Sequence, residues 1–111
     1  NTTISRPHLR SAHRDEGGAL SGAPLKTLAL QRLKDFRSAA GEDMPLIAAG
    51  GIENGVDAYA RIRAGASLVQ LYSALVYQGP TLARSINSEL KRLLARDGFS
   101  RLKEAVGADA A

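Results

Sequence analysis

The sequence predicts an α/β fold in which short parallel strands alternate with amphipathic helices. Continuous apolar runs at residues 45–49 and 67–72 are typical of strands that are buried on both faces of a parallel sheet. The segments around these runs place apolar residues at three- and four-residue steps, as amphipathic helices do. Strands separated by helices form right-handed parallel βαβ units rather than hairpins. Loops rich in glycine or small residues follow the strand ends, which is where α/β folds bind ligands.

The first part of the chain has its own signals, taken in order. Residues 1–4 are predicted to end a strand, and a polar loop follows as far as Gly22. A helix over 24–40 begins at Pro24, whose missing N–H costs nothing in a first turn, and Gly41 ends it. Its expected apolar stripe consists of Leu25, Leu28, Ala29, Leu33 and Phe36.

Three more helices are predicted downstream, over about 55–64, 80–96 and 100–106. In the first of them, one face is expected to hold Val56, Tyr59 and Ile62. In the longest, the buried stripe is expected to consist of Leu82, Ile86, Leu90, Leu93 and Leu94. The predicted order of elements is therefore β-loop-α-β-α-β-α-α.

The length of 111 residues limits the architecture to one domain, residues 1–111. Two architectures fit: an open doubly wound sheet, of which three strands make a poor version, and part of an eight-fold β/α barrel. A complete barrel needs about 250 residues, so the chain would supply about three of its eight units. The chain starts at Asn1 and its only Met is Met44, so we expect an upstream segment to be missing.

The composition excludes several classes of function. The chain has no Cys, which excludes thiolate metal sites and thiol catalysis. The net charge of +4 comes from basic residues scattered among acidic ones, and aromatic residues make up only 5% of the chain, so no nucleic-acid partner is expected. No apolar run approaches the roughly 18 residues that a membrane-spanning helix requires.

Three loops at strand ends are candidates for a phosphate site: 17–22, 50–55 and 72–74. Paired glycines let backbone N–H groups approach an anion with no Cβ in the way. A helix that follows such a loop adds the partial positive charge of its N-terminus. A purely structural role stays open for each loop, since Gly50-Gly51 could be a tight turn and Ser73 a helix cap.

Groups for acid–base chemistry or metal binding are few. His8 and His13 lie in the polar loop without a partner at a metal-ligand spacing, so no metal site is predicted. Glu53 is either a base or an acid favoured by the dipole of the helix that follows. No Ser–His–Asp arrangement or pair of carboxylates is evident. We therefore assign no catalytic residue and interpret the chain as the binding half of a site.

Four segments form a specific pattern: NTTISRP at 1–7, GGALSGAPL at 17–25, PLIAAGGIENGVDAYARIRAGASLVQLYSALVYQGP at 45–80 and DGF at 97–99. They resemble the C-terminal third of class 2 dihydroorotate dehydrogenase, the quinone-dependent FMN enzyme of pyrimidine (UMP) biosynthesis. Tyr72-Ser73 favours class 2, because class 1 relatives usually have a GTA-type segment there. Ala19 is a departure, since many relatives have GGLSG without it, whereas Gly22 is anchored by the SGAPL segment.

The resemblance implies a TIM (β/α)8 barrel, of which this chain supplies the last three βα units. It implies that Asn1 and Thr2 bind dihydroorotate or orotate. It implies that FMN is contacted by Gly22, Gly51, Tyr72 and Ser73, with Gly50 helping its loop approach the phosphate.

The resemblance also implies what lies elsewhere in the parent protein. The family's catalytic serine, its FMN-contacting lysines and the N-terminal helices that engage quinone and membrane match no position here, so the isolated chain is expected to be inactive. The parent is expected to be peripheral, on the cytoplasmic face of the bacterial inner membrane. Two other hypotheses stay open: a non-catalytic half-barrel module that binds phosphate or flavin, and a partner subunit that completes a barrel by association.

Overall fold

The computed structural model describes residues 1–6 and 8–110 of the chain. Strand β1 (Ile47–Ala49) pairs in parallel with strand β2 (Leu68–Gln70), and helix α2 (Gly55–Arg63) connects them as a crossover. The parallel βαβ unit that the sequence predicts is therefore present. The other elements are the 3₁₀ turn η1 (Ala23–Leu25) and the helices α1 (Lys26–Ala40), α3 (Ser73–Gln78), α4 (Leu82–Arg96) and α5 (Leu102–Ala105).

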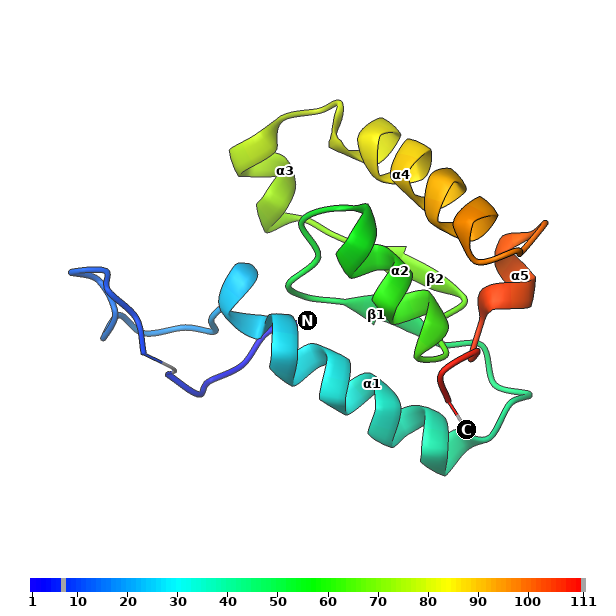
Figure 1. Cartoon of the computed structure of the whole chain (residues 1–111). Helices are drawn as coiled ribbons and strands as arrows, with labels where there is room; N and C mark the ends of the chain where they lie inside the picture. The colour runs from blue at the N-terminus through cyan, green and yellow to red at the C-terminus, as the bar shows by residue number, and fades with distance from the viewer. Residues whose placement is uncertain (7, 111) are drawn as a thin grey trace.

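The helices cover one face of the two-stranded sheet. Figure 1 shows α2 in front of the strands, with α1 on one side and α4 on the other. The core between them is aliphatic, and Ala58 and Ile62 of α2 lie at its centre with side chains that are fully buried. Helix α4 buries the stripe that the sequence predicts: Leu82, Ile86, Leu90 and Leu93, with Leu94 half-buried.

Local signals determine where the helices begin and end. Gly41 has a φ of 73° and closes α1, donating its N–H to the carbonyl of Arg37. Asn54 caps α2 by accepting a hydrogen bond from the N–H of Asp57 at 2.8 Å. These residues place the end of α1 before β1 and the start of α2 directly after the Gly50-Gly51 loop.

The buried side chain of Arg37 fastens the two turns that precede the strands. Its guanidinium donates to the carbonyl oxygens of Met44, at 3.0 Å, and of Gly41 in the turn before β1. It also donates to the carbonyl of Gly65 in the turn before β2, from Nε at 3.2 Å and from Nη2. One side chain thus connects the turns at the amino-terminal ends of both strands.

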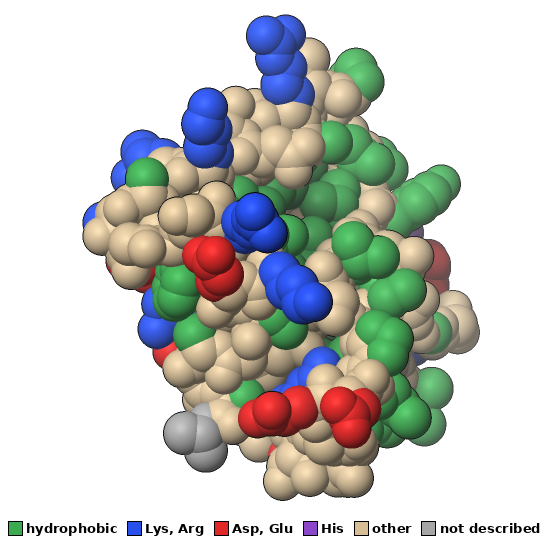
Figure 2. Space-filling model, turned by 90° about the vertical axis from the view of Figure 1, so that its right-hand side faces the viewer, with side chains coloured by type: hydrophobic (Ala, Val, Ile, Leu, Met, Phe, Trp, Pro, Cys, Tyr) green, Lys and Arg blue, Asp and Glu red, His purple; other side chains and the backbone are tan. Residues whose placement is uncertain are grey.

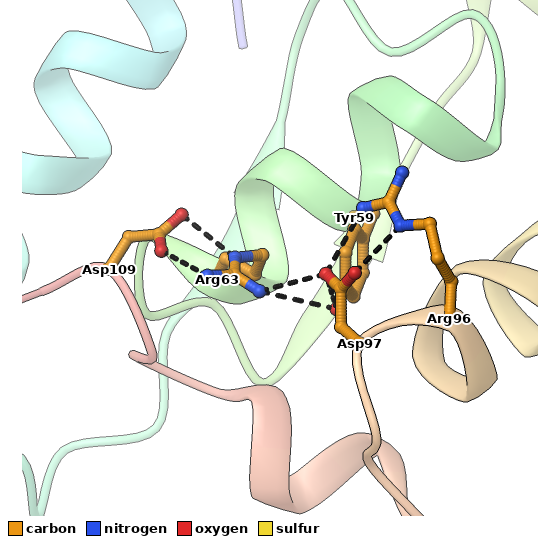
Figure 3. Close-up of polar contacts among 5 residues, drawn as sticks. All are labelled: Tyr59, Arg63, Arg96, Asp97 and Asp109. Carbon is orange, nitrogen blue, oxygen red and sulfur yellow. Dashed lines mark hydrogen bonds and ion pairs between the residues drawn. The ribbon is translucent and has the colours of Figure 1, made fainter.

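A network of ion pairs attaches the C-terminal segment to α2 (Figure 3). Arg63 lies between two carboxylates, with Asp97 at 3.0 Å and Asp109 at 2.5 Å. Asp97 also accepts hydrogen bonds from Arg96 at 2.7 Å and from the hydroxyl of Tyr59 at 2.8 Å. These contacts, that of the Arg96 guanidinium first, lower the pKa of Asp97 to about 2.

Four expectations about the elements are wrong or incomplete. Residues 1–4 do not form a strand, because only Thr3 pairs, in a single antiparallel bridge with Leu20. Both strands are shorter than the apolar runs that contain them. Helix α3 was not predicted. Phe36, Leu28 and Val56 were expected on buried faces but are exposed, because their faces of α1 and α2 meet no other element of the described chain.

The sheet face opposite the helices is bare. Ile47 and Leu68 are partners in the strand register, and both point to this face with exposed fractions of 54% and 60%. Figure 2 shows hydrophobic side chains gathered along one side of the surface that it draws. No helix in the described part of the chain is both long and apolar enough to cross a membrane.

Candidate functional site

The carboxyl ends of β1 and β2 open into a pocket of about 620 Å³. Four separate segments line it: residues 1–2, 21–23, 49–53 and 70–74, together with Tyr77. The pocket brings together all seven residues that the sequence assigns to a site: Asn1, Thr2, Gly22, Gly50, Gly51, Tyr72 and Ser73. Residues that are up to 72 positions apart in the chain therefore share one cavity.

Two glycines allow the segments around the pocket to approach closely. Gly22 has a φ of 85°, and a Cβ on it would lie 3.3 Å from the Cβ of Ser73. Gly50 has a φ of 98°, and a Cβ on it would lie 3.2 Å from the Cα of Asn1. Both backbone conformations are ones that other L-residues rarely adopt. Glycine at these positions thus brings the loop before α1 to α3, and the loop after β1 to the chain start.

Gly51 has a different role from the one that the paired glycines suggest. A Cβ on Gly51 would not project into open pocket space but would lie 2.5 Å from both the N and the Cα of Lys26. The expectation that a side chain here would fill the path of the anion therefore needs correction. Glycine is required because the loop rests on the backbone at the start of α1.

Unused backbone donors line the pocket. In the described part of the chain, no protein acceptor receives the N–H of Gly22 or of Gly51. Ser73 and Ala74 occupy the first turn of α3, where N–H groups have no acceptor within the helix. Ser73 adds a hydroxyl. A group of N–H donors from several segments suits an anion such as phosphate.

Charges at the rim of the pocket are paired. The ammonium group of Lys26 lies 2.9 Å from Glu53 and 2.9 Å from Asp57, and these carboxylates, Asp57 first, raise the pKa of Lys26. Asp57 also accepts the N–H of Glu53 at 3.1 Å, and Gln78 donates to the Glu53 carbonyl at 2.9 Å. Glu53 therefore has a structural partner at the rim, which favours the structural interpretation of this residue over that of a base.

Three polar residues of the pocket were not predicted as site residues: Ser21, Gln70 and Tyr77. Gln70 had a signal in the sequence, because it is the one polar residue inside an apolar strand and ends β2. Tyr77 had none, because α3 itself was missed. Ser21 precedes Gly22 in the predicted loop.

The two histidines lie outside this pocket. His13 pairs with Glu16 at 2.8 Å on the surface of the polar loop. His8 is exposed and lines a separate shallow pocket of the same loop. No group of three or more His, Cys, Asp or Glu residues within 1–6 and 8–110 is arranged to hold a metal ion.

Comparison with known proteins gives consistent matches over nearly the whole chain. Residues 1–94 match the family model described as dihydroorotate dehydrogenase. The chain is 62% identical over 109 residues to a protein of Erythrobacter litoralis named dihydroorotate dehydrogenase (quinone), covering 98% of this chain and 32% of that protein. A protein of the same name from Sphingopyxis alaskensis is 60% identical over 110 residues, covering 99% of this chain and 31% of that protein.

Solved structures show the same fold. Ligand-free DHODH of Eimeria tenella superposes with a TM-score of 0.96 at 44% identity, covering 100% of this chain and 31% of that one. DHODH of the same organism in complex with ferulenol gives a TM-score of 0.94 at 44% identity, covering 98% of this chain and 29% of that one. The chain therefore folds as part of a TIM barrel, as predicted, and spans about a third of the length of the relatives it matches.

Proposed function

The chain belongs to the dihydroorotate dehydrogenase family, and we propose that it is the flavin- and substrate-binding third of a quinone-dependent dihydroorotate dehydrogenase. The parent enzyme oxidises dihydroorotate to orotate in pyrimidine biosynthesis. One observation supports this most: the pocket at the carboxyl ends of β1 and β2 gathers every residue that the resemblance assigns to FMN or substrate. A TIM barrel binds its ligands at this end of the strands.

The residues present fit FMN as the flavin. Free N–H groups of Gly22 and Gly51, with the hydroxyl and N–H of Ser73, form the donor set that a flavin phosphate requires. Tyr72 lies beside Ser73 on the same wall of the pocket. When bound, FMN supplies the redox chemistry by accepting a hydride from the substrate.

The role of this chain in the reaction is to bind and orient. We assign to Asn1 and Thr2 the hydrogen bonds that hold the carboxylate and ring polar groups of dihydroorotate. Asn1 suits this role because its backbone lies against Gly50, which places the substrate contacts directly beside the glycine loop. Orientation of this kind accounts for a large part of rate enhancement when two reactants meet in one site.

The base that removes the proton is assigned to the part of the parent outside this chain. None of the described residues around the pocket is an unpaired acid or a histidine, since Glu53 is held by Lys26. Quinone binding and peripheral attachment to the cytoplasmic face of the bacterial membrane belong to the same proposal for the parent. The word quinone in the names of the relatives supports the choice of electron acceptor.

The alternative of a self-sufficient flavin module has less support. Its sheet would leave Ile47 and Leu68 uncovered, and a bare apolar face of this kind indicates a missing partner surface. The remaining strands of the parent barrel provide such a partner. A separate subunit that completes the barrel by association would do the same, and the mass of the native protein distinguishes the two cases.

The test compares the parent protein with residues 1–111 alone. We expect the purified parent to contain FMN and to reduce a quinone with dihydroorotate, and the isolated chain to show no turnover. Fluorescence quenching of FMN by the isolated chain measures whether it binds flavin without upstream residues. A parent that purifies without flavin, or an isolated chain that turns over dihydroorotate, would contradict the proposal.

A further inference from the structure

A buried arginine lies directly behind the glycine loop of the pocket. Arg61 of α2 has an exposed fraction of 1% and is absent from the pocket lining. Its Nη2 donates to the carbonyl of Gly50 at 3.2 Å and to the carbonyl of Lys26 at 2.7 Å. One nitrogen atom thus joins three segments: α2, the loop after β1 and the start of α1.

The position of this guanidinium determines the direction of one peptide group. The Gly50–Gly51 peptide is trans, so the N–H of Gly51 points away from the carbonyl of Gly50. Arg61 binds that carbonyl from outside the pocket lining, whereas Gly51 lines the pocket and its N–H has no acceptor among the described residues. The N–H is therefore directed to the pocket side. Gly51 also rests on the Lys26 backbone, whose carbonyl Arg61 holds as well. The two hydrogen bonds of Arg61 therefore set the position of the Gly50-Gly51 loop against α1 and the direction of its peptide group.

The charge of Arg61 has no acidic hydrogen-bond partner. Both of its acceptors are backbone carbonyls, and its buried Nε has no partner in the described chain. Asp57, one turn earlier on α2, is paired with Lys26 instead. Burial lowers the pKa of Arg61, which reflects the cost of holding this charge out of water. A buried cation without a direct counter-charge stabilises an anion bound at the adjacent loop.

We propose that Arg61 is a positioning residue for the phosphate site: by holding the Gly50 and Lys26 carbonyls it presents the Gly51 N–H to the phosphate, and so sets the preference for a phosphorylated flavin. The inference rests on the proposed function. It concerns the phosphate, because the groups that Arg61 holds are the backbone carbonyl of Gly50 and that of Lys26, on which the proposed phosphate loop rests. Loss of Arg61 is therefore expected to lower the affinity for FMN. The affinity for riboflavin, which lacks the phosphate, is expected to stay unchanged.

The experiment uses the apo form of the full-length parent, titrated with FMN and with riboflavin by fluorescence quenching. For Arg61→Met we expect FMN affinity to fall about tenfold, as for loss of a charge-assisted hydrogen bond, with riboflavin affinity unchanged. Arg61→Lys keeps a charged donor and is expected to retain FMN affinity within about threefold. Arg84→Met is the matched control, because Arg84 is exposed on α4, away from the pocket.

The outcomes separate this inference from the proposed function. If Arg61→Met does not fold, Arg61→Gln replaces it, since a shorter neutral amide does not reach the carbonyls, and the same selective loss is expected. An equal loss of FMN and riboflavin, or an unchanged preference for FMN, would overturn the role of Arg61 alone. A wild-type parent that binds no FMN would overturn both the role of Arg61 and the proposed function.

Discussion

Gly51 rests directly on the backbone of Lys26, so that a Cβ on Gly51 would lie 2.5 Å from both the N and the Cα of that residue. Contacts this short with backbone cannot be relieved by a side-chain rotation. The loop after β1 and the first turn of α1 are therefore a single packed unit. Any change that separates them alters the pocket, although neither atom of Lys26 lines it.

Replacing Gly51 by Ala tests this contact. The new Cβ must displace α1 or the loop and also holds a φ of 70°, so we expect a loss of at least about 3 kcal/mol of stability. We also expect the parent to lose its flavin. Gly41→Ala is the control, because Gly41 has a φ of 73° and open space around it, and strain alone costs about 1–2 kcal/mol. Chemical denaturation and flavin absorbance measure both effects, and equal losses in the two variants would refute the contact.

Replacing Gly22 by Ala tests the contact with Ser73. The added Cβ lies 3.3 Å from the Cβ of Ser73, which pushes α3 away from the loop before α1. We expect FMN affinity in the parent to fall about tenfold, as when one well-placed hydrogen bond is lost. Gly98→Ala, at a similar φ of 80° but in open space, should leave FMN affinity unchanged. Ser73→Gly removes the steric contact together with a hydroxyl of the donor set, so Gly22→Ala is also measured in the Ser73→Gly background. Gly22→Ala should cost less FMN affinity there than in the wild type, and an equal cost in both backgrounds would count against this explanation.

Replacing Asn1 by Ala in the parent tests substrate binding separately from flavin binding. The side-chain amide is lost, but the backbone that lies against Gly50 remains. We expect the KM for dihydroorotate to rise about tenfold or more, with FMN content unchanged, because one or two hydrogen bonds to a charged substrate are lost. Steady-state kinetics and flavin absorbance measure the two properties. A variant that loses flavin would show that Asn1 acts mainly on the loop.

Asp97 makes stability depend on pH in the acid range. Its pKa is about 2 in the folded chain, below its ordinary value of 3.8, because Arg96 and Tyr59 bind the ionised form. A lowered pKa contributes stability that is fully present above about pH 4 and is lost as the pH falls towards 2. We expect Asp97→Asn to lower the Tm at pH 6, and the Tm values of the two proteins to converge near pH 2. Asp35→Asn, at an exposed pair with Arg32, is the control. A constant difference across this range would contradict the assignment.

Leu68 lies on the bare sheet face and is exposed in this chain, but we expect its substitution to destabilise the parent protein. If the rest of the parent barrel covers Leu68, then Leu68→Ala should cost about 2–5 kcal/mol, as for a buried leucine. Val56→Ala is the control, since Val56 is exposed to 54% on the outer side of α2 and should change stability by less than about 0.5 kcal/mol. Denaturation of the parent measures both. A small effect at Leu68 would mean that the face stays open.

The helices were predictable because their signals are local. Apolar spacing indicated α4, and Gly41 and Asn54 mark boundaries by conformation and capping. Helix α3 escaped because six residues make fewer than two turns, too short for a period of 3.6 to show. The exposure of Phe36 could not be predicted from the sequence either. Spacing shows that a face is apolar but not whether its partner lies in the same chain.

Two of the loops that line the pocket were predictable, because parallel strands end at one edge and the loops after β1 and β2 meet there. The place of Asn1 and Thr2 in the site came only from the family resemblance. The sequence did not reveal which side chains support the pocket loops from behind. Arg61 and Arg63 lie two residues apart on one helix, yet only Arg61 is buried beneath the loop, while Arg63 pairs with acids near the surface. That difference depends on the direction in which α2 crosses the strands, which no short motif encodes.

The hydrogen bonds from Arg37 to two turns restrict how the length of the chain can change in evolution. Insertion or deletion in the turn before β1 would move the carbonyls of Gly41 and Met44 out of reach of one rigid guanidinium. The same guanidinium also binds the carbonyl of Gly65, so the two turns share one side chain. The length of this turn is thus constrained by a residue outside it. Among the described residues, the polar loop near Ala19 is bonded to Thr3 through Leu20 and not to either strand, so a change of length is better tolerated in that loop than in the turn before β1.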